Sequence, residues 1–155
     1  LTERTKNLRS QLRQLQRPIK LRARQLKNRP KRSPQHSTES SYERSRLLEA
    51  VKLFNEKDYF ECHEILEDIW FDVRDNSRDF FRGLLHIAVG FYHLRNKKNQ
   101  SGALTQLNKA LTRLENYGDV FKGVDLETLK AEVRKLISVH QKKGTPKNFP
   151  KIVIE

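Results

Sequence analysis

The chain has 155 residues, of which 35% are hydrophobic and 33% charged, and its net charge is +13. This length predicts one domain with appendages, and no apolar run approaches the roughly 20 residues that a membrane-spanning helix needs. The one cysteine, Cys62, excludes an intrachain disulfide and fits a reducing compartment.

The positive charge is concentrated at one end of the chain. Residues 1–38 contain twelve Lys or Arg residues and one acid, Glu3, for a net charge of +11, whereas residues 39–155 contain twenty basic and eighteen acidic residues, for a net charge of +2. We therefore divide the chain into a basic arm with a linker (1–38), a near-neutral helical domain (39–143) and an extended C-terminal tail (144–155).

The arm is predicted to contain one short helix. Apolar residues recur at helical spacing at Leu8, Leu12, Leu15 and Ile19. A parallel stripe contains Arg9, Arg13 and Arg17. Pro18 should end this helix near Arg17. The segment "NRPKRSPQHSTESS" that follows has two prolines, several serines and no periodicity, which predicts a linker.

The domain is predicted to contain five amphipathic helices. They span about residues 41–55, 59–74, 78–96, 101–116 and 126–142. The predicted N-caps are Ser40, which forms a capping box with Glu43, then Asp58, Ser77 and Asp125. Short connections place neighbouring helices antiparallel, so the fold class is an all-α, five-helix antiparallel bundle-like domain with an extended basic arm.

The tail "TPKNFPKIVIE" is predicted to be extended. Its "KIVI" segment is a candidate to pair or to pack, but two prolines argue against a central strand.

Three blocks in this order carry a resemblance to a known family. They are "LFNEKDYFECHEILEDIW", "RDFFRGLLHIAVGFYHLRNKKNQSGALTQLNKALTRL" and "YGDVFKGVDLETL". Together they resemble the small helical domain known as domain of unknown function three-hundred-and-nine, over about residues 44–137. The resemblance implies an all-α bundle found in bacteria, archaea, cyanobacteria and plastids, and it implies no established activity. Arg82 stands where members of the family often have Gln, and the basic arm lies outside the resemblance.

The segment "ECHEILEDIW" contains the candidate polar site. His63 and Glu67 lie one helical turn apart and share a face, with Glu64 beside them. On the next helix, His86 and His93 lie two turns apart. If the two helices face each other, these groups would converge, and imidazole with carboxylate suits zinc, iron or manganese.

Known metal motifs nevertheless do not fit this segment. A carboxylate-bridged di-metal bundle needs Glu-x-x-His pairs, and neither Glu61 nor Glu64 has a histidine three residues later. The zinc-protease pattern fails because position 67 is Glu. We therefore expect a satisfied polar cluster that ties the helices together, with no metal, cofactor or catalytic residue. A binding cleft lined by this cluster with Trp70 and Tyr92 stays open as an alternative.

Two further residues of the segment are interpreted as core. Cys62 lies beside acids, which raise the pKa of a thiol and disfavour nucleophilic catalysis. Trp70 falls at the core spacing of its helix.

The basic arm is the predicted partner-binding segment. Its candidate residues are Arg9, Arg13, Arg17, Arg22, Arg24, Arg29, Leu8, Leu12 and Leu15. The leucine stripe favours an acidic protein surface, because phosphate needs no apolar stripe whereas a protein groove does. RNA backbone binding is the alternative, although the arm has no aromatic residue on which bases would stack. An anionic membrane surface is favoured less, because aromatic anchors are missing, and a solvated tail without a partner stays open.

The predicted function is a non-enzymatic adaptor or assembly subunit of a large complex, in which the arm holds an acidic partner. The resemblance suggests a photosynthetic or other plastid complex, and hence the plastid (chloroplast) or the cyanobacterial cytoplasm. The alternative is an RNA-associated, ribosome-bound protein. A metal-dependent enzyme that uses His63, Glu64, Glu67 and His93 comes third.

Overall fold

The computed structural model describes residues 36–146 and 148–155, and His36–Glu155 form one compact unit. Within these residues the helices are α3 (His36–Asn55), α4 (Tyr59–Asp72), α5 (Arg78–Arg95), α6 (Gln100–Leu114) and α7 (Leu126–Gln141). A short β-hairpin precedes α7, and its two strands, β1 (Val120–Phe121) and β2 (Val124–Asp125), have two residues each. The predicted all-α class with five helices in the domain is confirmed. The predicted arm helix lies outside the described residues.

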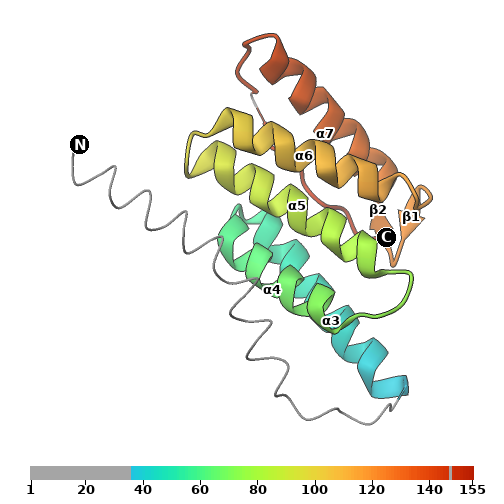
Figure 1. The fold of residues 1–155 in the computed structure, drawn as a ribbon. Helices are drawn as coiled ribbons and strands as arrows, with labels where there is room; N and C mark the ends of the chain where they lie inside the picture. The colour runs from blue at the N-terminus through green and yellow to red at the C-terminus, as the bar shows by residue number, and fades with distance from the viewer. Residues whose placement is uncertain (1–35, 147) are drawn as a thin grey trace, which may run out of the picture. The chain divides into compact units, whose positions relative to one another are not determined.

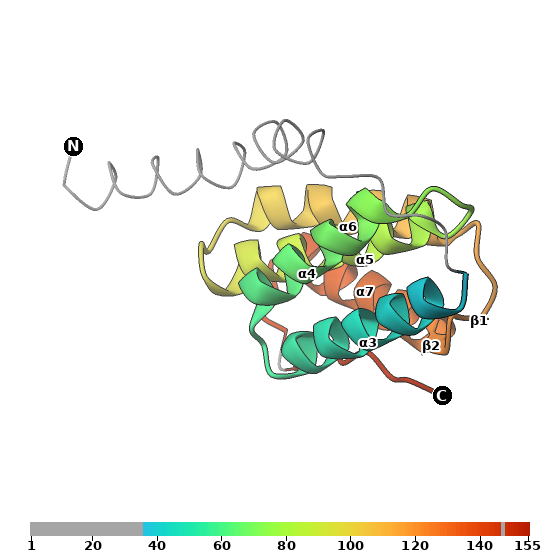
Figure 2. The same ribbon diagram turned by 90° about the horizontal axis from the view of Figure 1, so that it is seen from below.

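The helices follow one another side by side in chain order. The strongest packing joins α5 to α6, α4 to α5 and α3 to α4. Figures 1 and 2 show α4, α5 and α6 as one layer, with α3 and α7 in a second layer behind it. None of the described helices is long and apolar enough to cross a bilayer.

Close packing between α5 and α6 depends on two glycines of α5. A Cβ atom on Gly83 would lie 2.7 Å from Leu114 Cγ, and one on Gly90 would lie 2.8 Å from Leu107 Cδ2. Real Cβ atoms essentially never come so close, so glycine lets the α6 leucines sit directly against the α5 backbone.

Of the four predicted helix caps, Asp58 and Asp125 are confirmed, whereas Ser77 and Ser40 do not cap their helices as predicted. The Asp58 side chain accepts a hydrogen bond from the Glu61 N–H at the start of α4, and Asp125 accepts one from Thr128 N–H at 2.9 Å at the start of α7. Ser77 precedes α5, but its side chain makes no cap hydrogen bond to that helix, because the hydroxyl donates to Asp75 instead.

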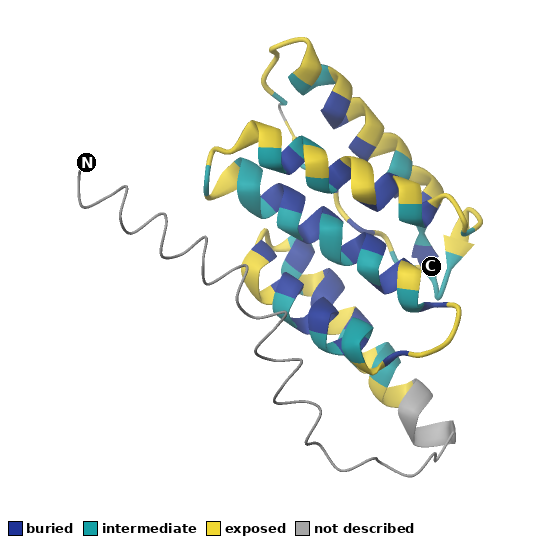
Figure 3. Cartoon of the chain, viewed as in Figure 1, coloured by how far each residue is buried: buried dark blue, intermediate teal, exposed yellow. Residues whose placement is uncertain are grey.

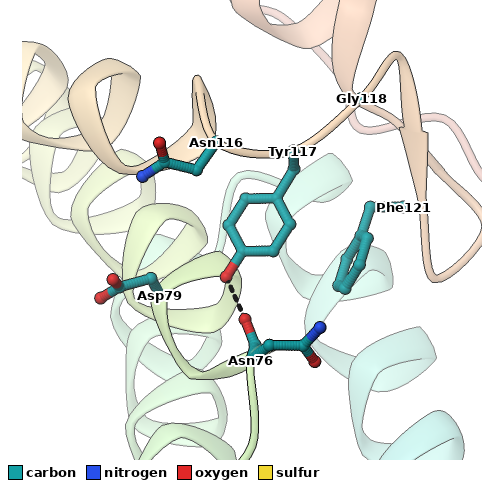
Figure 4. A pocket seen from close by; sticks show the side chains of 6 residues that line it. All are labelled: Asn76, Asp79, Asn116, Tyr117, Gly118 and Phe121. Carbon is teal, nitrogen blue, oxygen red and sulfur yellow. Dashed lines mark hydrogen bonds between the residues drawn. The ribbon is translucent and has the colours of Figure 1, made fainter.

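A tyrosine distant in sequence caps α5 in place of Ser77. The Phe80 N–H, in the first turn of α5, donates to the Tyr117 hydroxyl at 2.9 Å, and that hydroxyl donates to the carbonyl of Asn76 (Figure 4). The orphan N–H of the helix is thus satisfied from the loop after α6.

The first helix of the domain starts earlier than predicted. It begins at His36, inside the predicted linker, so Ser40 lies within the helix and is not its N-terminal boundary. Each residue added to an established helix gains a hydrogen bond without a new nucleation cost, which favours extension of α3 from its packed half. Glu43 pairs with Lys122 in the hairpin, at 2.6 Å.

The C-terminal tail pairs with the hairpin, which is one of the two roles that the sequence left open for its "KIVI" segment. Ile154 forms an antiparallel bridge with Val124, and the Glu155 N–H donates to Gly123 O at 2.8 Å. The Asn55 side chain makes two hydrogen bonds with the Ile152 backbone. Asn55 Nδ2 donates to Ile152 O at 2.9 Å, and the Ile152 N–H donates to Asn55 Oδ1 at 2.8 Å. The "KIVI" segment therefore lies at an edge, where its flanking prolines are tolerated.

The core is continuous across all these elements (Figure 3). At its centre the Phe91 ring of α5 lies 5.6 Å from Phe54 of α3, 5.5 Å from Tyr59 of α4 and 5.6 Å from Phe149 of the tail, between ring centroids. The aromatic contacts among these four rings join three helices and the tail.

Candidate functional site

The structure places three of the predicted site residues together on α4. His63 Nδ1 lies 3.4 Å from Glu64 Oε1, and His63 Nε2 lies 3.4 Å from Glu67 Oε2. His63 is only 7% exposed and Glu67 only 5%, whereas Glu64 is half-buried. Helical spacing produces this arrangement, because Glu67 is one turn beyond His63 and Glu64 is its immediate neighbour.

The two ring nitrogens of His63 face different carboxylates. A neutral imidazole has one N–H and one acceptor nitrogen, whereas the protonated ring has an N–H on both sides. Each ring nitrogen of His63 faces a carboxylate oxygen, so the protonated form matches both neighbours. These contacts become ion pairs only when the imidazole ring carries the extra proton.

The same three groups are the candidate metal ligands of the described residues. One ligand atom from each of His63, Glu64 and Glu67 lies within 4.8 Å of the others. Imidazole and carboxylate suit zinc, iron or manganese. All three belong to one helix, so a metal held here would need further ligands from water or a substrate to reach four-coordination.

The predicted convergence of the α5 histidines with this cluster does not occur. His86 Nδ1 lies 2.7 Å from Gln106 Oε1 of α6, so His86 belongs to the α5–α6 interface. Burial lowers the pKa of His86; Gln106 opposes this, and Arg82, Arg113 and Lys109 lower the pKa further. Burial also lowers the pKa of His93, with a contribution from Lys97. A helix of this domain has neighbours on two sides, and spacing alone does not say which side a histidine faces.

The two other residues considered as a cleft lining, Tyr92 and Trp70, make different contacts. Phe60 is 40% exposed, and its ring lies 5.9 Å from His63 and 5.8 Å from Tyr92, between centroids. Trp70 packs partly against the core, as predicted, but its ring also lies 4.5 Å from the Arg78 guanidinium and 5.5 Å from that of Arg82. These guanidinium contacts were not predicted.

A surface pocket lies elsewhere in the described part of the chain. Its lining is formed by Asn76, Asp79, Asn116, Tyr117, Gly118 and Phe121 (Figure 4). It shares no residue with the His63 cluster, and its tyrosine hydroxyl is engaged in capping α5.

Cys62 lies in the core beside the cluster. The side chain is fully buried, and burial, with a smaller contribution from Asp58, raises the pKa of its thiol to about 12. A thiol with this pKa is protonated at neutral pH and is a poor nucleophile.

The partner-binding residues predicted on the arm, from Leu8 to Arg29, lie outside the described residues.

Comparison with known proteins finds a family that resembles part of this domain. Residues 47–105 match the family described as "Domain of unknown function (DUF309)". Over this segment the chain is similar to members of the DUF309 family. The DUF309 segment runs from the middle of α3 into α6, so it contains the whole His63 cluster, while α7, the tail and the basic arm lie outside it.

Two bacterial proteins are similar to parts of this chain. One, from Aquifex aeolicus (strain VF5), is described as an uncharacterized protein and is 28% identical over 102 residues, which cover 65% of this chain. The other, the uncharacterized protein YpuF of Bacillus subtilis (strain 168), is 41% identical over 54 residues, which cover 34% of this chain. The matched segments span 30% of the length of each relative.

Proposed function

We propose that this protein is a non-enzymatic adaptor that fastens parts of a larger assembly together. The observation that carries the proposal is that most of the positive charge lies in the N-terminal segment, whereas the hydrophobic core lies in the helical domain. Residues 1–38 hold a net charge of +11, while the core of residues 36–155 is assembled from the domain's own helices and tail. A cationic segment joined to a domain with its own core suits a tether between two partners.

The proposed partner of the arm is an acidic protein surface. Leu8, Leu12 and Leu15 form a stripe beside Arg9, Arg13 and Arg17, so one helix would offer both an apolar and a cationic face. A protein groove uses both faces, whereas a phosphate backbone uses only the second. Arg22, Arg24 and Arg29 would extend the cationic contact beyond Pro18.

The proposed role of the His63 cluster is structural. Two of its three residues are buried, and each ring nitrogen of His63 has a carboxylate oxygen 3.4 Å away on the same helix. It would hold α4 rigid so that the bundle surface keeps its shape for a second partner.

The proposed cellular setting is a photosynthetic or other plastid assembly, or its counterpart in the cyanobacterial cytoplasm. This proposal derives from the family resemblance alone. A ribosome-bound role is the second candidate function, and a basic surface on the domain, described below, favours it.

One substitution separates protein docking from phosphate binding by the arm. Full-length protein is used as bait for affinity capture, beside Leu12→Asp and the matched control Gln14→Asp, at about 0.05 and about 0.2 M salt. Both substitutions add one negative charge, but only Leu12 lies on the apolar stripe. Protein docking predicts that Leu12→Asp abolishes capture at both salt concentrations and that Gln14→Asp retains it.

The competing outcomes are distinct. Capture that survives Leu12→Asp but collapses at the higher salt concentration would replace protein docking with phosphate binding. Stoichiometric zinc, iron or manganese in the purified protein, lost in His63→Ala, would replace the structural role of the cluster with a metal site.

A further inference from the structure

The helical domain is electrically polarised, although its net charge is only +2. Residues 36–77, which contain α3 and α4, hold five basic and eleven acidic residues, a net charge of −6. Residues 78–114, which contain α5 and α6, hold seven basic residues and one acid, Asp79, a net charge of +6. The positive half is therefore a second basic region, separate from the arm.

Part of this charge gathers beside the α5–α6 interface, at Arg82, Lys109 and Arg113. Arg78, one turn before Arg82, lies against Trp70 of α4 and donates to the carbonyl oxygens of Trp70 and Val73. We call Arg78 and Arg82 of α5, with Lys109 and Arg113 of α6, the basic ridge. The two residues of each helix are one turn apart, and the glycine contacts hold the helices close together.

The ridge cations lie near enough to influence one another. Burial lowers the pKa of Arg82, and the nearby charge of Arg113 lowers it further. His86, the next residue along the α5 side of the ridge, is affected by Arg82, Arg113 and Lys109 together. Clustered like charges repel one another, which costs folding free energy unless an anion compensates them.

The ridge is only partly neutralised within the described part of the chain. Asp79 pairs with Arg113 at 2.6 Å, while neither Arg82 nor Lys109 has a carboxylate within ion-pair distance there. The Trp70 ring supports the guanidinium groups of Arg78 and Arg82, which limits their freedom. Supported guanidinium groups lose less entropy when they bind an oxyanion.

The side chains of the ridge favour a phosphate backbone over a protein as its partner. The large apolar side chains that are exposed on the domain are Tyr42, Leu48, Phe60, Val120 and Val153, and none of them lies on α5 or α6. Protein interfaces depend on buried apolar and aromatic anchors, whereas phosphate binding needs only guanidinium and ammonium groups. We propose that the basic ridge binds the phosphate backbone of a nucleic acid. This surface acts independently of the partner held by the arm.

The test compares charge reversals that differ only in position. Lys109→Glu reverses an exposed charge on the ridge, and Lys135→Glu reverses an exposed charge on α7. Both are made in the full chain, so the arm contributes equally to each. Binding is measured by fluorescence anisotropy with oligouridine RNA and with oligothymidine DNA of equal length, from about 0.05 to about 0.2 M salt.

We expect Lys109→Glu to weaken binding to both strands about 5- to 10-fold and to reduce the salt slope by about 1, with less than about a twofold change for Lys135→Glu. A triple variant, Arg82→Gln, Lys109→Gln and Arg113→Gln, should lose more than a control triple on α7 and its C-cap, Lys130→Gln, Lys135→Gln and Lys142→Gln. Circular dichroism verifies that each variant is folded. A loss of binding to only the RNA or only the DNA oligonucleotide still supports phosphate contact and shows which nucleic acid the ridge binds.

Two results would overturn the proposal. Equal losses for ridge and α7 variants would mean that only the overall charge matters. Loss of poly-glutamate binding in Lys109→Glu, with unchanged RNA and DNA binding, would make the ridge a docking surface for an acidic polypeptide.

Discussion

The acidic half of the helical domain (residues 36–77) and its basic half (residues 78–114) place a histidine in opposite surroundings. On α4, in the half with a net charge of −6, His63 lies between the carboxylates of Glu64 and Glu67. On α5, in the half with a net charge of +6, His86 contacts the neutral Gln106 and lies near Arg82, Arg113 and Lys109. Burial and the nearby cations lower the pKa of His86 and favour its neutral ring, whereas the ring of His63 faces two carboxylates. A near-neutral total charge therefore conceals two surfaces of opposite sign.

The largest effect should come from breaking the junction of the two halves. Phe91 of α5 is fully buried against Phe54, Tyr59 and Phe149. We expect Phe91→Ala to lower the free energy of unfolding by about 3–5 kcal/mol, because it removes apolar contacts and leaves a cavity. Denaturant titration measures this. The control Phe60→Ala removes a half-exposed ring and should cost less than about 1 kcal/mol; equal losses would mean that Phe91 is not the junction.

A smaller effect should come from the acidic half. We expect His63→Ala to destabilise the domain by about 1–3 kcal/mol, because it removes the partner of the buried Glu67 carboxylate. Adding Glu67→Gln should then cost less in the His63→Ala background than in the unaltered protein, as measured by a double-mutant cycle. Additive losses would show that the two side chains do not interact.

The smallest effect, a pH dependence, should come from the basic half. The folded pKa of His86 is below its usual 6.5. Between these two values the unfolded chain binds the extra proton and the folded chain does not, so stability falls as the pH falls below 6.5. The variant His86→Gln should flatten this decline, which urea titrations over a series of pH values would detect. A steeper decline in the variant would reverse the assigned direction.

Local signals predicted the helices well. Asp58 and Asp125 cap α4 and α7 as expected, because a side chain two or three residues from the N–H it binds needs no help from the rest of the fold. The same reasoning failed at α5, where Tyr117 supplies the acceptor from 37 residues away. It also failed at the start of α3, where extension of a packed helix outweighed the Ser40 signal.

The candidate site divides in the same way. Spacing within one helix brought His63, Glu64 and Glu67 together, as predicted. It did not bring His86 to them, because which neighbour a helix face meets depends on packing between helices. The net charge of residues 39–155 does not predict the basic ridge, because the +6 of residues 78–114 is largely cancelled by the −6 of residues 36–77. A count for each predicted helix would have found it.

The sequence by itself determined the helix positions, two of their caps, the α4 cluster and the segregation of charge into the arm, since each depends on residues within a few positions or on composition. Only the tertiary structure decided the Tyr117 cap, the partner of His86, the ridge across two helices and the binding of the tail through Asn55 and Ile152, which are 97 residues apart. Contacts of this kind form because burial of the shared core brings distant segments together, and no local pattern records them.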